Sequence, residues 1–465
     1  RIEALVIFKT VIRTQYKIFR SGTNMPVKGK FFVETYGCQM NEHDSQKMFE
    51  LLQRQGFSKA GAIDQADVIV INTCAIREKA EHKVYSSLGK LRSAKIEKPE
   101  TVIVVAGCVA QQQKHEFLRK FRHLDLVLGT HQISQLPSLV SRILEKRERI
   151  SAVEFVDNIE SLHMSAPNYS SSPVCSYVTI MQGCSNFCSY CVVPYTRGKE
   201  SSRSLEEIQE EVSGLATKGI REITLLGQNV NAYGKDLYNF RRFDDLLQRL
   251  SSVSGIERIR FTTSHPKDFD SALVEAIASI DKVCEHIHLP LQSGSDKVLK
   301  DMRRGYCLND YFEKIELLRT KVPKCAVTTD MIVGFPGESE EDFEDTLNAL
   351  QRIRFDQIFS FKYSSRPGTV AQGMPDQIRE ETKKERLAKV HALQDSITEA
   401  WHRDLEGSIQ EALVEGIGRL PNQFHGRTRT NKIVNFDDNG SLSLGDLVNV
   451  RVTRGLKHSL LGSIV

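Results

Sequence analysis

Residues 184–191 read CSNFCSYC, inside the longer segment VTIMQGCSNFCSYCVVPYTRG (residues 178–198). The stretch sets Cys184, Cys188 and Cys191 with three and then two residues between them, and no fourth cysteine follows. A tetrahedral zinc site or an ordinary four-iron cluster takes four protein ligands. Three thiolates leave one coordination position open, and an open position distinguishes a catalytic metal site from a structural one. The spacing therefore favours a [4Fe–4S] cluster with one free iron over a zinc knuckle or a ferredoxin-like loop.

The segment belongs to a series of strand–helix units between Ser176 and about Ser364. The predicted strands read SYVTIMQ, EITLLG, RIRFTT, HIHLPL, AVTTDMIVG and QIFSFKYS, with helical stretches such as LEEIQEEVSGLATKG between them. Six such units predict an open, partial (β/α)6 barrel, and barrels of this kind place their chemistry at the carboxyl ends of the strands. The three cysteines occupy the loop after the first of these strands.

The first third of the chain, residues 30–145, also alternates strands with helices. The runs KFFVET, ADVIVIN, TVIVVAG and DLVLG are apolar and short. Helical patterns lie around Asp44–Gln55, Ile76–Leu91 and Ala110–Phe121. Continuous apolar runs with helices between them predict an α/β domain with a parallel sheet covered on both faces.

A second set of three cysteines follows these strands: Cys38 comes after the first, Cys74 after the second and Cys108 after the third. The carboxyl ends of parallel strands lie at one edge of a sheet, so three consecutive loops can converge there. Three buried thiols or a zinc site are the alternatives, but no His or fourth Cys recurs at such a loop. The pattern therefore predicts a second three-cysteine iron–sulfur cluster.

After Gly407 the pattern changes to short β runs separated by turns, which predicts a small β-barrel. From Gly416 to Val465 there are seven Lys or Arg and three Asp or Glu. The basic residues gather in GRTRTNK, with Arg427, Arg429 and Lys432, and in RVTRGLKH. A basic β-barrel is typical of an RNA-binding module that contacts phosphates, and an oligomerisation or structural barrel is the alternative. In an extended segment Arg427 and Arg429 share one face, and Lys432 joins them only if the intervening Thr-Asn makes a turn.

Composition narrows the classes of protein. The chain has 465 residues, too many for one core, and a net charge of +4, so any nucleic-acid footprint is local. No apolar run approaches the roughly 20 residues that span a bilayer, and no phosphate-binding glycine motif appears. The chain contains ten cysteines without a signal-peptide pattern. This usage indicates metal or redox chemistry in the cytoplasm, not a disulfide scaffold. Four cysteines outside the two sets are expected to be structural: Cys175, Cys284, Cys307 and Cys325.

The order of these units predicts the domain boundaries. Residues 1–27 are expected to be a disordered N-terminal extension, either a presequence or sequence upstream of a start at Met25. We expect the first α/β domain at 28–145, the barrel at 170–402 and the small β-barrel at 404–465.

The cysteine spacing on the first barrel loop resembles that of the radical S-adenosylmethionine (SAM) superfamily. The whole order after Met25 resembles the methylthiotransferases, which join a three-cysteine domain, a radical SAM core and a C-terminal TRAM domain. The similarity is closest to the branch that modifies isopentenylated adenosine in tRNA. It rests on ETYGCQMNEHDS, INTCAIREKAEHK, GCSNFCSYCVVPYTRG, LLGQNVNAYG, RIRFTTSHP and GRTRTNKIVNF. GCVAQQ departs slightly from the family pattern, but its cysteine is present.

This resemblance implies two [4Fe–4S] clusters per chain, together with SAM. The Cys184, Cys188 and Cys191 cluster would reduce SAM to a 5′-deoxyadenosyl radical. The auxiliary cluster, on the other three cysteines, would hold the sulfur to be delivered. One SAM would supply the radical and another the methyl group. Polar side chains on the barrel loops would bind SAM: Gln228, Asn229, Gln292 and Ser293.

The implied reaction is 2-methylthiolation at C2 of N6-dimethylallyladenosine beside the anticodon. The implied partners are the tRNA anticodon stem-loop, an electron donor of the flavodoxin or ferredoxin type and a sulfur donor, with no membrane. Two enzymatic alternatives stay open, a methylthiotransferase acting on threonylcarbamoyladenosine in tRNA or on an aspartate of a ribosomal protein. The non-enzymatic alternative is an iron–sulfur or zinc RNA-binding protein.

Overall fold

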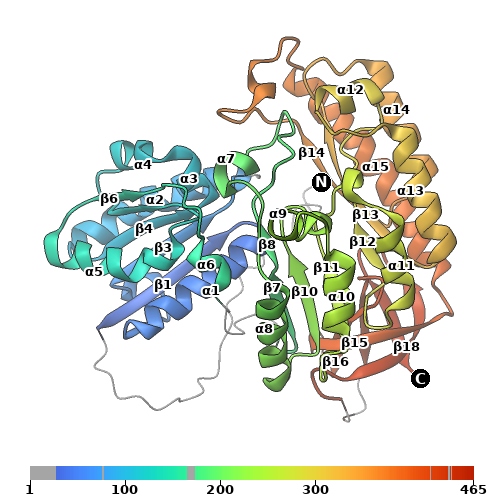
Figure 1. Cartoon of the computed structure of the whole chain (residues 1–465), viewed down its shortest axis with the longest axis horizontal. Helices are drawn as coiled ribbons and strands as arrows, with labels where there is room; N and C mark the ends of the chain where they lie inside the picture. Colours follow the sequence, from blue (N-terminus) through green and yellow to red (C-terminus); the bar gives the residue numbers. More distant parts are fainter. Residues whose placement is uncertain are drawn as a thin grey trace.

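The computed structural model describes residues 28–75, 78–164, 173–418, 420, 422–437, 440 and 442–465. It shows an N-terminal parallel-sheet domain, a central partial barrel and a small C-terminal barrel that lies against the central one (Figure 1). The predicted fold class is confirmed. The predicted extension at residues 1–27 lies outside the described residues.

The N-terminal sheet has six parallel strands in the order β2-β1-β3-β4-β5-β6. Side chains alternate between its two faces. Ile69 and Ile71 of β3 pack toward α2 and α3, whereas Val68 and Val70 pack toward α1 and α5. Burial on both faces explains why these strands read as continuous apolar runs. The strands are β1 (Gly29–Tyr36), β2 (Phe57–Lys59), β3 (Val68–Thr73), β4 (Val102–Gly107), β5 (Leu126–Leu128) and β6 (Ile150–Ala152).

The helices of this domain differ from the sequence predictions at their ends. The first starts directly after Cys38, and the predicted helix at 110–121 is two helices that begin at Cys108 and break at Lys114, whose φ is 49°. Strands β2 and β6 were not predicted, because their sequences FSK and ISA each contain a single large apolar residue, whereas β5, which has the same length, is wholly apolar (LVL). Since β6 pairs with β5, the sheet runs beyond residue 145, where the sequence predicted its domain to end. The helices are α1 (Gln39–Arg54), α2 (Glu78–Glu97), α3 (Cys108–Gln113), α4 (His115–Lys120), α5 (Leu136–Lys146) and α6 (Glu160–His163).

The central domain is a partial barrel of six parallel strands. Backbone hydrogen bonds join β7, β10 and β11 in one sheet and β12, β13 and β14 in another, and a parallel bridge between Ile259 and Val283 links the two. All six predicted barrel strands are therefore present. They are β7 (Cys175–Thr179), β10 (Glu222–Leu226), β11 (Arg258–Phe261), β12 (His286–His288), β13 (Ala326–Val333) and β14 (Gln357–Lys362).

Helices cover the outside of the barrel, and capping residues set where they begin. The hydroxyl of Ser204 accepts a hydrogen bond from the backbone N–H of Glu207, and Ser339 does the same for Asp342 at the start of another helix. Two short antiparallel strands, β8 (Met181–Gln182) and β9 (Ser201–Ser202), pair with each other at the two ends of the cysteine loop. The helices are α7 (Val193–Arg197), α8 (Leu205–Thr217), α9 (Lys235–Tyr238), α10 (Phe243–Ser251), α11 (Ser271–Ser279), α12 (Asp296–Asp301), α13 (Leu308–Lys321), α14 (Glu340–Ile353) and α15 (Glu380–Asp404).

The C-terminal domain is a closed barrel in the order β15-β16-β17-β19-β18. Its β16 was not predicted, because the run QFHGRT has little apolar character. Gly426 lets β16 approach β15, since a Cβ atom there would lie 2.6 Å from the carbonyl oxygen of Leu413. The strands are β15 (Ile409–Ile417), β16 (Gln423–Thr428), β17 (Ile433–Asp437), β18 (Leu447–Gly455) and β19 (Leu460–Ile464).

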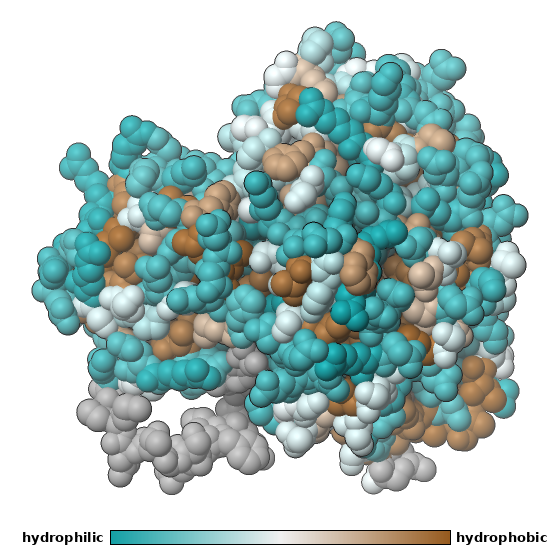
Figure 2. All heavy atoms as spheres, in the orientation of Figure 1, coloured by the Kyte–Doolittle hydropathy of each residue, from teal (hydrophilic) through white to brown (hydrophobic). Residues whose placement is uncertain are grey.

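The surface is mostly hydrophilic on the face that Figure 2 shows, with hydrophobic atoms scattered in small groups. Among the helices that the structure describes, none is long and apolar enough to cross a bilayer.

Candidate metal centres

The structure brings Cys38, Cys74 and Cys108 to the carboxyl edge of the N-terminal sheet, as the topology predicted. Cys38 lies two residues after β1, Cys74 directly follows β3, and Cys108 directly follows β4. These strands are neighbours, and their last residues are in register. A hydrogen bond from the Cys74 N–H to the carbonyl of Tyr36 ties two of the loops, with an N–O distance of 2.9 Å. We call this set the N-terminal triad.

The electrostatics of the N-terminal triad suit metal ligation. A hydrogen bond with Cys74 lowers the pKa of Cys38 to about 6. The charge of Arg197 also lowers this pKa, whereas burial raises it. Burial raises the pKa of Cys108, with the Arg197 charge opposing. Because the thiolate is the metal-binding form, Cys38 is ready to ligate at neutral pH, whereas Cys108 needs a nearby cation to lose its proton. The donor set therefore fits an iron–sulfur cluster.

The second set, Cys184, Cys188 and Cys191, lies in the loop after β8, and we call it the barrel triad. Two backbone hydrogen bonds shape the loop, from Cys184 N to the carbonyl of Gly198 (3.1 Å) and from Cys191 N to the carbonyl of Cys188 (3.0 Å). The guanidinium of Arg304 donates to the Cys188 sulfur at 3.3 Å. The sequence analysis did not identify Arg304 as a site residue, because no local sequence pattern marks it. Arg304 lies on the loop after α12.

The barrel triad disfavours free thiolates without a cation. Burial, assisted by the charge of Cys188, raises the pKa of Cys184 to about 11 and that of Cys191 to about 12. The thiols of Cys184 and Cys191 therefore lose their protons only when a metal compensates the charge. This set also fits an iron–sulfur cluster.

Several buried polar atoms without a hydrogen-bond partner lie at the carboxyl ends of the barrel strands. Within the described ranges six of them lie at the end of β8 or after the barrel strands β10, β11, β12 and β14, while Glu222, Arg258 and His286 carry others at the opposite end. An unpartnered buried polar group costs free energy, so several of them at one end of a barrel indicate a polar ligand. They are Gln182 Nε2, Asn229 Oδ1, Ser264 Oγ, His265 Nε2, Gln292 Oε1 and the Tyr363 hydroxyl.

The four side chains expected to bind SAM divide into two kinds. Asn229 and Gln292 are buried and keep an unpartnered oxygen at this end of the barrel. The Gln228 side-chain oxygen instead accepts the backbone N–H of Gly183 at 2.5 Å, which holds the start of the cysteine loop. The hydroxyl of Ser293 accepts from the backbone N–H of Ser295 and shapes a turn. The site assignment stays a prediction, with Asn229 and Gln292 the better placed.

Sequence reasoning missed three polar residues at this end of the barrel. Ser264 and His265 follow β11, and Tyr363 follows β14. Burial lowers the pKa of His265 to about 2, so its ring is neutral. Their position directly after predicted strands was a usable signal, because ligands bind at the carboxyl ends of barrel strands.

Arg427, Arg429 and Lys432 do not present the free basic face that the sequence predicted. Each is ion-paired within the chain, Arg427 with Glu415 (2.9 Å), Arg429 with Glu285 (2.7 Å) and Lys432 with Asp356 (2.5 Å). The reason is that this segment lies between the two barrels and its charges meet carboxylates there. Thr430 and Asn431 do make the turn on which the position of Lys432 depended, since Asn431 has a φ of 65°. The predicted RNA-binding role therefore loses the free cations on which it rested.

Cys175 lies beside two carboxylates, in a cavity of about 210 Å³ between the central and C-terminal barrels. One ligand atom each of Cys175, Glu222 and Glu415 lies within 4.8 Å of the others. However, Arg260 contacts Glu222 at 2.8 Å and Arg427 contacts Glu415 at 2.9 Å. These guanidinium groups already neutralise the carboxylates, so the cluster does not suit a metal cation.

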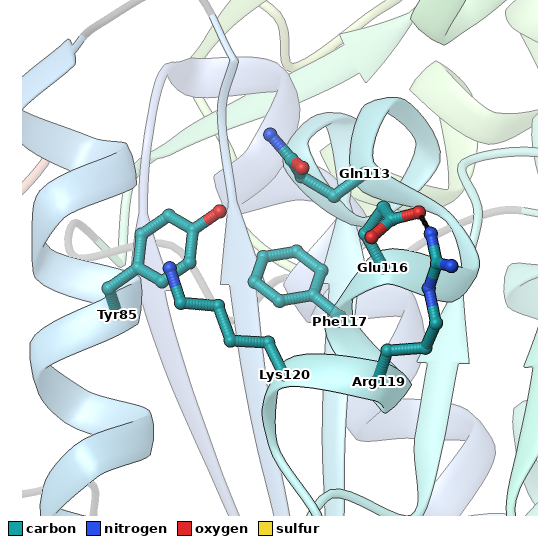
Figure 3. A pocket seen from close by; sticks show the side chains of 6 residues that line it. All are labelled: Tyr85, Gln113, Glu116, Phe117, Arg119 and Lys120. Carbon is teal, nitrogen blue, oxygen red and sulfur yellow. Dashed lines mark ion pairs between the residues drawn. The ribbon is translucent and has the colours of Figure 1, made fainter.

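A hollow of about 390 Å³ on the N-terminal domain is separate from both triads (Figure 3). It lies between α2 and the α3–α4 corner, and the Lys120 ammonium sits 4.2 Å from the ring centroid of Tyr85. Glu116 and Arg119 form an ion pair on its other side. Because no cysteine lines it, this hollow is not part of the metal centres.

Comparison with known proteins covers the three domains. The model of the uncharacterized protein family UPF0004 matches residues 30–129, that of the radical SAM superfamily matches 178–350, and that of the TRAM domain matches 403–465. The chain is 45% identical over 438 residues to a tRNA-2-methylthio-N(6)-dimethylallyladenosine synthase of Natranaerobius thermophilus, covering 94% of this chain and 96% of that protein. It is 47% identical over 433 residues to the same enzyme of Geobacter metallireducens, covering 93% and 98%.

Solved structures support the fold. The radical SAM methyltransferase TsrM from Kitasatospora setae, with cobalamin and a [4Fe–4S] cluster bound, superposes with a TM-score of 0.53 at 12% identity, over 74% of this chain and 77% of TsrM. The cobalamin-dependent radical SAM enzyme OxsB superposes with a TM-score of 0.52 at 12% identity, over 79% of this chain and 56% of OxsB. With both cysteine triads in place and close relatives over nearly its whole length, the chain belongs to the family of radical SAM methylthiotransferases that includes the tRNA-2-methylthio-N(6)-dimethylallyladenosine synthases.

Proposed function

We propose that this chain is a tRNA methylthiotransferase that replaces the hydrogen at C2 of N6-dimethylallyladenosine, beside the anticodon, with a methylthio group. One observation carries the proposal: each of two neighbouring domains offers three cysteines, and the helices that follow the two triads, α3 and α7, pack on each other (Figure 1). A radical that one centre would generate and a sulfur that the other would hold could then act on one substrate. The sequence similarity to enzymes of this name supports the choice of substrate.

The adenine C2–H bond is unactivated, so its cleavage has to come from a cofactor. When bound, two [4Fe–4S] clusters and SAM would supply the radical, the sulfur and the methyl group. The side chains of this protein bind and orient these groups. The barrel triad would hold the cluster that binds SAM, and the N-terminal triad would hold the auxiliary cluster. The unpartnered oxygens of Asn229 and Gln292 would accept hydrogen bonds from SAM, while Gln228 fixes the loop.

The same proposal extends to partners and boundaries. We propose that an electron donor of the flavodoxin or ferredoxin type and a sulfur donor complete the reaction, and that the protein acts in the cytoplasm. We propose domains at about 28–152, 170–402 and 404–465, with the first one lengthened so that it includes β6.

For tRNA binding we propose the outer face of β18 in place of the ion-paired segment. Arg451 and Arg454 are exposed there, and no ion pair engages either of them among the residues that the structure describes. Exposed guanidinium groups suit phosphate oxygens. A tRNA backbone that crosses this face would meet both.

Changing Arg451 and Arg454 together to Ala should weaken tRNA binding and flatten its salt dependence by about two phosphate contacts. The measurement is a salt titration of tRNA affinity. The matched control changes Arg427 and Arg429 to Ala, which should lower thermal stability through the lost contacts with Glu415 and Glu285 but keep the salt slope. An unchanged slope in the first variant together with a flattened slope in the control would return RNA binding to the ion-paired segment.

Anaerobic reconstitution tests the function itself. The enzyme should bind about eight irons per chain, cleave SAM, and convert isopentenylated tRNA to the 2-methylthio form, as nucleoside mass spectrometry would show. Parallel reactions with threonylcarbamoylated tRNA and with the ribosomal protein separate the enzymatic alternatives. Bound zinc, or no SAM cleavage, would instead support an RNA-binding protein without this activity.

A further inference from the structure

Arg197 belongs to the barrel domain by sequence but reaches the N-terminal triad. It is the sixth residue after Cys191, at the end of α7, and its side chain is 2% exposed. Its Nε donates to the Cys108 sulfur at 3.3 Å, and its Nη2 donates to the Asp44 carboxylate at 2.6 Å. One guanidinium thus joins a cysteine after β4 and a carboxylate on α1 to the segment that carries the barrel triad.

We propose that Arg197 is a positioning residue for the auxiliary cluster: it holds the Cys108 sulfur and, by donating hydrogen bonds to the sulfur ligands, raises the reduction potential of that cluster. The proposal deepens the function proposed above and rests on it for the presence of the cluster. The proposal gives a role at the auxiliary cluster to a residue that belongs to neither cysteine triad.

The hydrogen-bond inventory of Arg197 supports this role. Within the described part of the chain its Nη1 has no acceptor, although the whole side chain is buried. A buried charged donor without a partner is costly. Cysteine sulfurs and the sulfides of a cluster are acceptors, and a cluster on the N-terminal triad would bring several of them next to this guanidinium. Hydrogen bonds to the sulfurs are among the factors that set iron–sulfur potentials.

A second arginine repeats the arrangement at the other centre. Arg304 is also buried and donates to the Cys188 sulfur at 3.3 Å, the same distance as from Arg197 to Cys108. Its other contacts include the carbonyl of Pro290 at 2.9 Å, within its own domain. In each triad, therefore, a buried arginine donates a hydrogen bond to one cysteine sulfur. Of these two arginines, Arg197 is the one that belongs to a different domain from the cysteine it contacts.

The domain contact does not rest on the Arg197 side chain alone. The Thr130 hydroxyl donates to the carbonyl of Thr196 at 2.6 Å, and His131 Nε2 donates to the carbonyl of Arg197 at 2.9 Å. These bonds use the backbone of α7, so they persist when the guanidinium is removed. A substitution at position 197 therefore changes the surroundings of Cys108 while α7 stays docked.

The test measures the auxiliary cluster alone. In a background with Cys184, Cys188 and Cys191 changed to Ala, the N-terminal triad holds the only expected cluster, and its midpoint potential is read by redox titration with EPR detection. Arg197→Met should lower this potential, because a donor and a positive charge are lost, and Arg197→Lys should give an intermediate value. Loss of iron from Arg197→Met, with Arg197→Lys loaded at the intermediate potential, would also support the proposal.

Either of two results would overturn the proposal and leave Arg197 as a structural contact. One is an unchanged potential and EPR spectrum in Arg197→Met, and the other is the parental potential in an Arg197→Lys variant that still binds the cluster. With both triads intact, Arg197→Met should transfer sulfur to tRNA roughly 10- to 100-fold more slowly than the parent enzyme. Arg304→Met is the reciprocal variant and should shift the potential of the barrel-triad cluster only. Failure of the proposed function would show as no methylthiolated tRNA with the parent enzyme, whatever the potentials are.

Discussion

Replacing Cys184, Cys188 and Cys191 together by Ala should abolish SAM cleavage and leave about four irons per chain on the N-terminal triad. The reason is topological, since the N-terminal triad lies on its own sheet with its own hydrophobic core. Iron analysis, the visible spectrum and 5′-deoxyadenosine release measure the two outcomes separately.

The reciprocal variant changes Cys38, Cys74 and Cys108 to Ala. It should keep SAM cleavage and about four irons per chain but lose all methylthiolation. Circular dichroism controls for folding in both cases. If either triple variant stays folded and yet loses all of its iron, the two centres are not independent and the division into two sites is wrong.

Changing Gly107 to Ala should remove the auxiliary cluster with only one added methyl group. Gly107 precedes Cys108 and has φ 89° and ψ −159°, a region that only glycine occupies readily. A Cβ atom there would also press on the side chain of Asn72 and the backbone of Thr73. We expect a cost of about 1–3 kcal/mol for the backbone conformation alone, together with a displaced Cys108. Iron content should fall by about half while SAM cleavage persists.

Gly89 is the matched control, because it lies within α2 in the same domain and a Cβ atom there meets nothing within 4 Å. Gly89→Ala should keep both clusters and raise stability by about 0.4–1 kcal/mol, since alanine has the higher helix propensity. Thermal unfolding and iron analysis of the two variants side by side separate a local effect on Cys108 from a general effect of glycine replacement. Full iron content in Gly107→Ala would mean that the loop tolerates a side chain.

Strand periodicity predicted most of the fold because it is a local property. The apolar runs of β1, β3 and β4 marked strands buried on both faces, and all six barrel strands were found from their patterns. Strands β2 (FSK) and β6 (ISA), at the two edges of the sheet, were missed because they lack the continuous apolar run that marks the equally short β5 (LVL). The break at Lys114 also escaped, because a positive φ at a lysine leaves no mark in the sequence.

The sequence by itself determined where both cysteine triads lie, because the N-terminal triad follows three parallel strands that end at one edge of the sheet, and the barrel triad lies within a single loop after β8. Only the tertiary structure decided which charges are free. Arg429 meets Glu285 across 144 positions of the chain, and Arg197 meets Cys108 across 89. No local period encodes such pairs, since they depend on which surfaces the domains bring together. A basic run that reads as an RNA-binding face is thus neutralised between two barrels, and an arginine beside one triad serves the other.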